Sequence, residues 1–115
     1  MNQPIAETTV EELAQCLLYT GRHNIQLLDV REPQEIAIAR IDGFINIPLS
    51  KVAQWSEEVL SRLDPHMETL VLCHHGIRSA QMCQWLVSQG FTNVKNIAGG
   101  IHAYSSLIDN SIPQY

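Results

Sequence analysis

Thr69-Leu70-Val71-Leu72-Cys73 leads directly into His74-His75-Gly76-Ile77-Arg78, and the junction of these two stretches decides the fold. The first stretch is apolar and favours extended backbone, so it predicts a buried strand with Cys73 at its end. Residues 79–89 have a helical pattern, and Gly90 is placed to end that helix in the left-handed conformation that glycine tolerates. The sequence therefore predicts a strand, a short glycine-containing loop and a helix, with a cysteine where the strand ends.

Short apolar stretches and amphipathic stretches alternate through the rest of the chain. Thr9 and Glu12 form a capping-box pattern that opens a helix at 10–19, and Gly21 closes it. Further strands are predicted at 25–30, 44–47 and 94–97, and further helices at 32–39, 50–63 and 101–107. Ser50 caps the helix at 50–63, which carries one apolar face formed by Val52, Trp55, Val59 and Leu63. The alternation predicts an α/β fold with a parallel sheet covered on both faces.

Length, composition and charge limit the classes of partner. The chain has 115 residues of uniform composition, which suits one domain, 1–115. It carries 12 Asp and Glu against 7 scattered Lys and Arg, so neither nucleic acid nor an anionic membrane is an expected partner. The sequence shows no signal-peptide pattern and no apolar run of about 20 residues, and its 3 cysteines lack paired spacing. These features predict a cytoplasmic protein with reduced thiols.

Two places in the chain carry polar residues directly after a predicted strand. In a parallel α/β sheet the ligand crevice lies at the carboxyl ends of the strands, which selects residues 29–31 and 73–78. The glycine in the second loop lets successive N–H groups turn inward at a helix start, a geometry that binds anions. The helix end favours a thiolate by about 0.3–1 kcal/mol, and each N–H···S⁻ bond by about 1 kcal/mol. Cys73 is therefore a candidate nucleophile, and burial as a small apolar residue is the alternative.

Four segments together resemble one known family. Cys73-His74-His75-Gly76-Ile77-Arg78-Ser79 resembles the C-x-x-G-x-R-S active-site loop of the rhodanese-like sulfurtransferases. Other signatures of that family are similar to Leu27-Leu28-Asp29-Val30-Arg31-Glu32, to Ile41-Asp42-Gly43-Phe44-Ile45-Asn46-Ile47-Pro48-Leu49, and to the glycine-containing stretches at 90–94 and 99–101. The resemblance covers about residues 7–107 in the family's order. It implies a three-layer α/β domain with a five-stranded parallel sheet and helices on both faces.

The resemblance also implies an activity. Cys73 would take a sulfane sulfur from thiosulfate or a persulfide, carry it as a cysteine persulfide, and pass it to a thiol, cyanide or protein acceptor. The loop residues would bind the sulfur anion or the donor: His74, His75, Gly76, Ile77, Arg78 and Ser79. Arg78 would either hold the donor or brace the loop by binding its carbonyls. No metal and no organic cofactor is implied.

The remaining site residues have a structural and a functional interpretation. Asp29 and Arg31 would support the site, and an ion pair or a helix cap is the simpler explanation for both. His74 and His75 stand where loops that favour thiosulfate often carry Arg or Lys, which leaves a persulfide or protein donor open. The tail at 109–115 is similar to the tails of rhodanese domains fused to ubiquitin-activating-like adenylyltransferases, so a sulfur-carrier protein stays among the expected acceptors.

Three other functions compete with small-molecule sulfur transfer. The domain could bind partners without catalysis, or it could relay sulfur between proteins. A Cys-Arg loop phosphatase or arsenate reductase is disfavoured, because four residues separate Cys73 from Arg78 where those enzymes have five. Cys16 and Cys83 are expected to pack in helices, as are Trp55 and Trp85.

Overall fold

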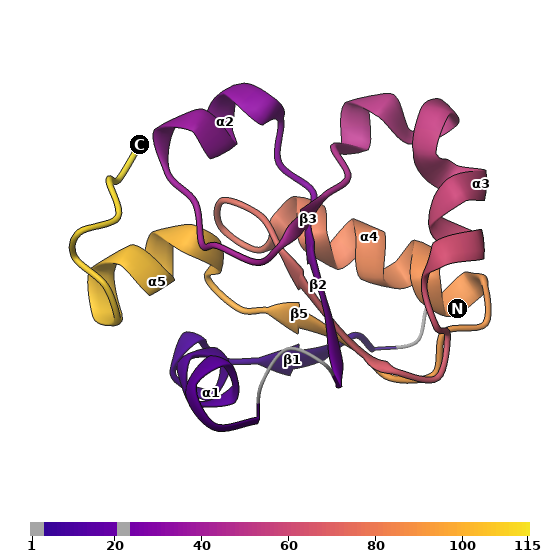
Figure 1. Ribbon diagram of the computed structural model, residues 1–115, viewed down its shortest axis with the longest axis horizontal. Helices are drawn as coiled ribbons and strands as arrows, with labels where there is room; N and C mark the ends of the chain where they lie inside the picture. Colours follow the sequence, from indigo (N-terminus) through magenta and orange to yellow (C-terminus); the bar gives the residue numbers. More distant parts are fainter. Residues whose placement is uncertain (1–3, 21–23) are drawn as a thin grey trace.

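Five parallel strands form one sheet in the order β1-β5-β4-β2-β3 in the computed structural model, which describes residues 4–20 and 24–115 (Figure 1). The strands are β1 (Ala6–Thr8), β2 (Ile25–Asp29), β3 (Ile45–Asn46), β4 (Glu68–Leu72) and β5 (Val94–Ile97). β2 and β4 pair in register from Ile25 opposite Glu68 to Asp29 opposite Leu72, so their carboxyl ends lie side by side. The predicted five-stranded parallel sheet is confirmed. β1 escapes the apolar pattern because only its last residue, Thr8, is buried.

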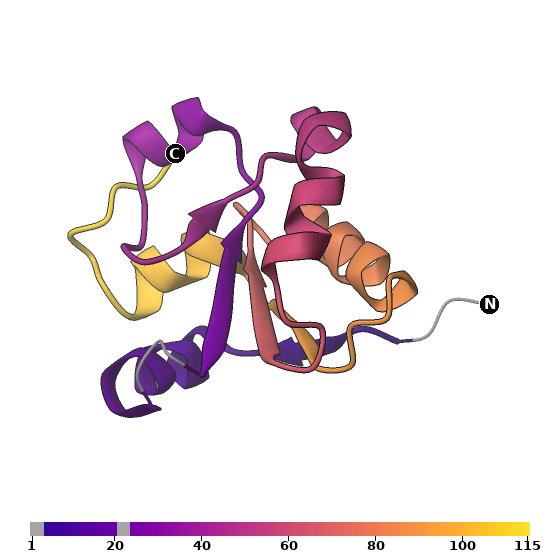
Figure 2. The same cartoon turned by 45° about the vertical axis from the view of Figure 1, so that its right-hand side comes forward.

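Helices cover both faces of the sheet (Figures 1 and 2). The helices are α1 (Val10–Gln15), α2 (Pro33–Ile38), α3 (Val52–Arg62), α4 (Ile77–Ser88) and α5 (Gly100–Leu107). Leu70 and Leu72 of β4 pack in the cluster that contains α1 and α5, whereas Val71 between them packs in the cluster that contains α3 and α4. Because successive strand residues point to opposite faces, the sheet has two separate apolar cores.

The predicted start and cap of the helix at 50–63 are wrong. The helix at 50–63 begins at Val52 after a 3-10 turn, η2 (Leu49–Lys51), and its N-cap is Lys51. Ser50 is not the cap, because its hydroxyl and its N–H both bind the carboxylate of Glu32. Val52 is 43% exposed and lies outside the apolar face predicted for it. Gly21 lies outside the described residues, and the first helix runs from α1 into a π-helical turn, η1 (Cys16–Thr20).

Local sequence signals give correct results elsewhere. Thr9 and Glu12 form the predicted capping box, with each side chain accepting from the other residue's N–H. Gly90 has a φ of +98° just after α4 and donates its N–H to Val87. Among the described helices, none is both long and apolar enough to cross a membrane. The fold thus places the end of β2, the end of β4 and the start of α4 at one edge of the sheet.

Candidate active site

Cys73 directly follows β4 at the carboxyl end of the sheet, and its side chain is 1% exposed. The chain then turns through His74 and His75 to Gly76, whose φ of +104° lies in the left-handed region. Gly76 is the N-cap of α4, so the helix begins at Ile77 rather than at the predicted Ser79. The loop therefore brings the start of α4 back to the cysteine sulfur.

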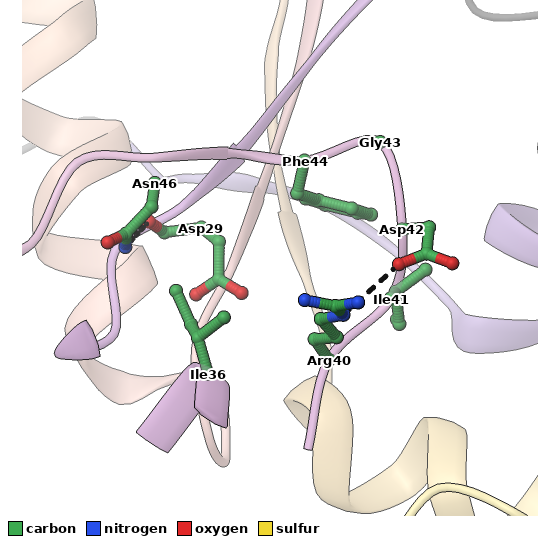
Figure 3. A pocket seen from close by; sticks show the side chains of 8 residues that line it. All are labelled: Asp29, Ile36, Arg40, Ile41, Asp42, Gly43, Phe44 and Asn46. Carbon is green, nitrogen blue, oxygen red and sulfur yellow. Dashed lines mark hydrogen bonds and ion pairs between the residues drawn. The ribbon is translucent and has the colours of Figure 1, made fainter. Parts of the chain in front are cut away.

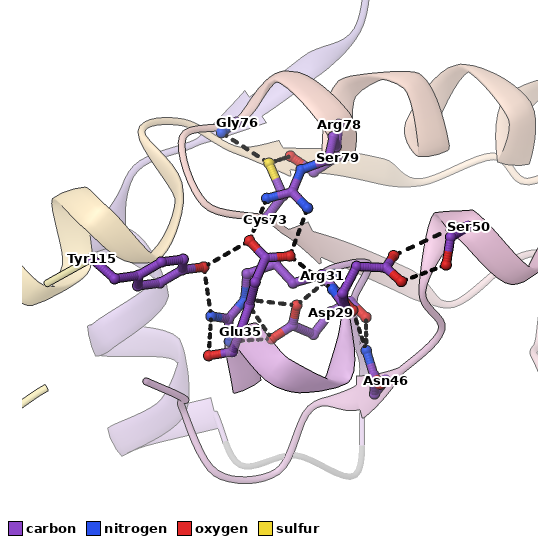
Figure 4. A network of polar contacts seen from close by, with 11 residues as sticks. Asp29, Arg31, Glu35, Asn46, Ser50, Cys73, Gly76, Arg78, Ser79 and Tyr115 are labelled. Carbon is purple, nitrogen blue, oxygen red and sulfur yellow. Dashed lines mark hydrogen bonds and ion pairs between the residues drawn. The ribbon is translucent and has the colours of Figure 1, made fainter. Parts of the chain in front are cut away.

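Two donors contact this sulfur. The N–H of Gly76 donates to Sγ over 3.0 Å, and the hydroxyl of Ser79 lies 3.2 Å from the same atom (Figure 4). The Ser79 hydroxyl also lies 2.5 Å from Oδ1 of Asn96, so its single proton can serve either acceptor. Asn96 donates from Nδ2 to the carbonyl oxygen of Gly76 over 2.9 Å, which ties the loop to β5. The site thus offers a sulfur anion one backbone donor and one side-chain donor.

The first turn of α5 packs against the cysteine loop and binds its carbonyl groups. Gly100 has a φ of +61°, and a Cβ there would lie 2.5 Å from the carbonyl oxygen of Cys73 and would also clash with that of His74. The missing side chain lets Ile101 donate its N–H to the Cys73 carbonyl over 2.9 Å, and His102 to the His74 carbonyl over 3.1 Å. The glycine pair before α5 therefore allows the close contact that fixes the cysteine loop.

Arg78 binds a carboxylate from another helix. Its two terminal nitrogens donate to the two carboxylate oxygens of Glu35 in α2, each over 2.8 Å. The hydrogen bonds from Arg78 lower the pKa of Glu35 to about 2, and the carboxylate raises the pKa of Arg78. The two roles predicted for Arg78 were donor binding and bonds to loop carbonyls, whereas its observed partner is Glu35. This bidentate pair fastens the start of α4 to α2.

Asp29 and Arg31 form a buried ion pair, as their structural interpretation predicts. The closest approach is 2.8 Å between Nη2 of Arg31 and Oδ2 of Asp29, and both side chains are almost fully buried. Burial lowers the pKa of Arg31, but hydrogen bonds with Asp29 and Tyr115 outweigh this effect and raise it. Asp29 also accepts from the N–H of Arg31 over 3.0 Å. The pair stiffens the end of β2, and the two charges neutralise each other.

Tyr115 links the two ion pairs. Its hydroxyl accepts from Nη1 of Arg31 over 2.9 Å and lies 3.1 Å from Oε1 of Glu35, to which it can donate (Figure 4). The phenol ring stacks on the imidazole of His74, with centroids 3.9 Å apart and planes 6° apart. The polar contacts therefore run without a break from Asp29 through Arg31, Tyr115 and Glu35 to Arg78.

The two loop histidines differ in their surroundings. His74 is partly buried, and burial, followed by the charge on His75, lowers the pKa of its imidazole. His75 is exposed and its ring centroid lies 4.0 Å from that of His74. Ile77, the apolar residue of the predicted loop, is 73% exposed. The side chain of His74 is thus held in place, whereas those of His75 and Ile77 face solvent.

A hollow of about 300 Å³ lies beside Asp29, which forms part of its lining (Figure 3). Ile36, Phe44 and Asn46 line it, together with the exposed ion pair between Arg40 and Asp42. Its lining does not include Cys73 or residues 74–79. The hollow is therefore separate from the cysteine loop.

The other two cysteines differ from Cys73 in their contacts. Cys83 is fully buried on α4, and burial, with a smaller contribution from Cys73, raises the pKa of its thiol to about 12. Cys16 is partly buried in the π-helical turn. Trp55 packs edge to face with Trp85, with centroids 5.6 Å apart. All four predicted packing roles agree with these positions.

The sequence did not single out four residues that the fold brings to this site. They are Glu35, Asn96, His102 and Tyr115. Glu35 gave no local signal, because its ion-pair partner Arg78 lies 43 residues further along the chain. The others come from β5, α5 and the tail, and their approach depends on tertiary packing.

Comparisons with known proteins agree on one family. Residues 10–107 match the family described as Rhodanese-like domain. The chain is 46% identical over 114 residues to the rhodanese-like/PpiC domain-containing protein 12, chloroplastic, of Arabidopsis thaliana, over 98% of the chain and 38% of that protein. A sulfurtransferase of Allochromatium vinosum is 32% identical over 88% of the chain and 89% of its own length. The crystal structure of a rhodanese-like domain protein from Staphylococcus aureus matches with a TM-score of 0.75 at 25% identity, over 96% of the chain and 99% of that protein. The chain thus spans well under half of the plant protein and nearly all of the two bacterial ones.

Proposed function

The chain belongs to the family of rhodanese-like domains, and from this premise we propose that it is a sulfurtransferase with Cys73 as its nucleophile. The observation that supports the proposal most is the pair of donors at Sγ, the Gly76 N–H at 3.0 Å and the Ser79 hydroxyl at 3.2 Å. Each hydrogen bond to a thiolate contributes about 1 kcal/mol, and the start of α4 adds about 0.3–1 kcal/mol. Both donors remain in reach of the sulfur before and after it accepts a second sulfur atom.

The proposed reaction has two displacement steps. The Cys73 thiolate attacks the outer sulfur of the donor, a new S–S bond forms, and the donor's own S–S bond breaks. The leaving group is sulfite when thiosulfate is the donor, and it is the corresponding thiolate when a thiol persulfide is the donor. An acceptor thiolate then attacks the terminal sulfur of the cysteine persulfide and regenerates the Cys73 thiolate. Cyanide in place of the thiol gives thiocyanate. The Gly76 amide and the Ser79 hydroxyl stabilise the sulfur anion that exists between the two steps.

The charges of the site favour a persulfide donor over thiosulfate. Both arginines near the sulfur are already paired, Arg31 with Asp29 and Arg78 with Glu35. A dianion therefore finds no unpaired guanidinium among these groups, and it meets the Glu35 carboxylate at Arg78. The reacting sulfur atoms of a thiol persulfide carry at most one negative charge, so their binding depends less on a free cation. We therefore propose that glutathione persulfide, or a protein persulfide, loads Cys73 faster than thiosulfate does.

A protein-to-protein sulfur relay is the second candidate function. The 1% exposure of Cys73 limits the access of small molecules. Ile77, 73% exposed beside the loop, offers an apolar contact to a protein acceptor. A small sulfur-carrier protein is the acceptor class that the tail at 109–115 suggests.

Intact-protein mass spectrometry tests both candidates. The native protein, Cys73→Ala and Cys16→Ala are each incubated with thiosulfate or with glutathione persulfide, and then with cyanide. We expect the native protein and Cys16→Ala to gain one sulfur that cyanide removes, with the persulfide acting faster, and we expect Cys73→Ala to gain none. Loading by neither donor would contradict small-molecule sulfur transfer, and the relay would then be tested with a persulfidated donor protein.

A further inference from the structure

Three histidine rings meet beside the cysteine loop. His74 and His75 belong to the loop, and His102 lies in the first turn of α5. One ring nitrogen from each histidine can be chosen so that the three atoms all lie within 4.8 Å of one another. The ring centroids of His75 and His102 are 5.0 Å apart, and those of His74 and His75 are 4.0 Å apart. Within the part of the chain that the structure describes, this is the one such group of histidine, cysteine or acidic side chains.

The backbone fixes the position of this cluster. The N–H of His102 donates to the carbonyl oxygen of His74 over 3.1 Å, and Ile101 bonds in the same way to Cys73 over 2.9 Å. Gly100 permits this approach because any side chain there would clash with the two carbonyl groups. The three histidines are thus held together by main-chain contacts, independently of how their rings are turned.

His74 has one ring nitrogen with the capacity to bind a ligand. Its Nε2 is buried and has no hydrogen-bond partner among the described residues. Most buried polar atoms in proteins are hydrogen-bonded, and a bound ion or water often satisfies one that has no protein partner. Tyr115 stacks on the ring at 3.9 Å and restricts its orientation. The unpaired nitrogen therefore belongs to the ring of the cluster that stacks on Tyr115.

We propose that His74, His75 and His102 bind one zinc ion. Imidazole nitrogens are good zinc ligands, and Zn–N bonds are about 2.0–2.1 Å long. Two ligands of a tetrahedral ion at that distance are about 3.4 Å apart, so the present separations of up to 4.8 Å must close. His75 and His102 are both exposed, and rotation of their side chains supplies the movement.

Three protein ligands leave the fourth position of the ion for water or for a thiolate. The charges nearby permit a divalent cation, because the guanidinium of Arg78 is paired with Glu35. The site lies next to Cys73 in the sequence but uses none of the groups that contact its sulfur. It therefore exists or fails independently of the proposed sulfur transfer. It also departs from the expectation, drawn from the family resemblance, that no metal is implied.

Competition with a chromogenic zinc chelator tests the proposal. Zinc chloride is titrated into the metal-free native protein and into four variants: His102→Asn, His75→Asn, His66→Asn and Cys73→Ser. His66 is the matched control, because it is an exposed histidine outside the cluster. We expect the native protein to bind one zinc ion, and each of the two ligand variants to bind it at least about tenfold more weakly. His66→Asn and Cys73→Ser should bind like the native protein, and circular dichroism checks that every variant folds.

Three results would overturn the site. If the native protein leaves all the zinc with the chelator at micromolar concentration, the proposal is rejected. Equal affinity of His102→Asn and the native protein would remove His102 from the ligand set. Loss of binding in Cys73→Ser would assign the zinc to the thiolate instead. Ring signals of His74 in two-dimensional NMR spectra that zinc shifts in the native protein but not in His102→Asn would support the proposed ligands.

Discussion

Replacing Glu35 with glutamine removes one charge from the ion pair that fastens α4 to α2. The carboxylate accepts two hydrogen bonds of 2.8 Å from Arg78, and these bonds lower its pKa from 4.5 to about 2. A shift of that size corresponds to about 3 kcal/mol of stability. The Arg78 side chain is 35% exposed, and solvent screening of such a pair reduces the figure to about 1–2 kcal/mol. We expect Glu35→Gln to lose that amount at pH 7.

The pH dependence gives the prediction its sharpest form. A carboxyl group with a lowered pKa in the folded state stabilises the protein fully above its unfolded value of 4.5, and this contribution is lost as the pH falls toward about 2. The difference between the native protein and Glu35→Gln should therefore be constant near neutrality and shrink below about pH 4.5. Urea unfolding followed by tryptophan fluorescence, at pH 7 and at about pH 3.5, measures it.

Glu68→Gln is the matched control for this experiment. Glu68 binds Lys95 over the same 2.8 Å, but both side chains are more exposed, at 30% and 38%. Exposed pairs of this kind contribute about 0.2–1 kcal/mol. If Glu35→Gln costs no more than Glu68→Gln, or if its cost is the same at both pH values, the account of the Arg78 pair is wrong.

Three further outcomes follow from the site. Tyr115→Phe keeps the stacked ring but loses the hydroxyl contacts, and it should cost about 1 kcal/mol in urea unfolding, whereas no cost would mean that those contacts are open in solution. Gly100→Ala should cost at least about 2 kcal/mol and slow the loading of Cys73, while Gly90→Ala, with a φ of +98° but nothing within 4 Å of the new Cβ, should cost about 1 kcal/mol and leave loading unchanged. Equal effects of these two variants would refute the clash with the loop. Cys83 should resist iodoacetamide in the folded protein at pH 8, because burial raises its thiol pKa to about 12, and peptide mapping would reveal any labelling that contradicts this.

Features encoded by neighbouring residues could be predicted from the sequence. The capping box of Thr9 and Glu12 spans one helical turn, so its two hydrogen bonds follow from residue types and spacing alone. The cysteine loop is similar, because a strand, Gly76 and a helix start are local patterns. Ser50 shows the limit of such reasoning. It has the residue type of a helix cap, but its N–H and hydroxyl bind the carboxylate of Glu32, which precedes it by 18 residues.

The rest of the site depends on contacts between distant segments. The sequence predicts that Arg78 binds the sulfur donor or the carbonyls of its own loop. Nothing in the sequence places the carboxylate of Glu35 opposite its guanidinium. His102 and Tyr115 approach His74 only after α5 has docked on the loop and the tail has folded back. The strand β1 could not be predicted from the sequence, because it has only one buried side chain and an apolar pattern requires several. Local patterns thus located the sulfur, and tertiary packing selected its neighbours.

The support of the cysteine loop by α5 has a consequence for the order of events during translation. Ribosomes release the chain from its N-terminus, so Cys73 emerges before Asn96, Gly100 and Tyr115. Until those residues arrive, the loop lacks the bonds to its carbonyl groups and the contact on His74. The emerging chain therefore already contains Gly76 and Ser79, the two donors to the sulfur, but not the contacts that fix the loop around it. Addition of the last helix is the step that fixes the cysteine loop, because its first turn supplies the N–H groups that bind the Cys73 and His74 carbonyls.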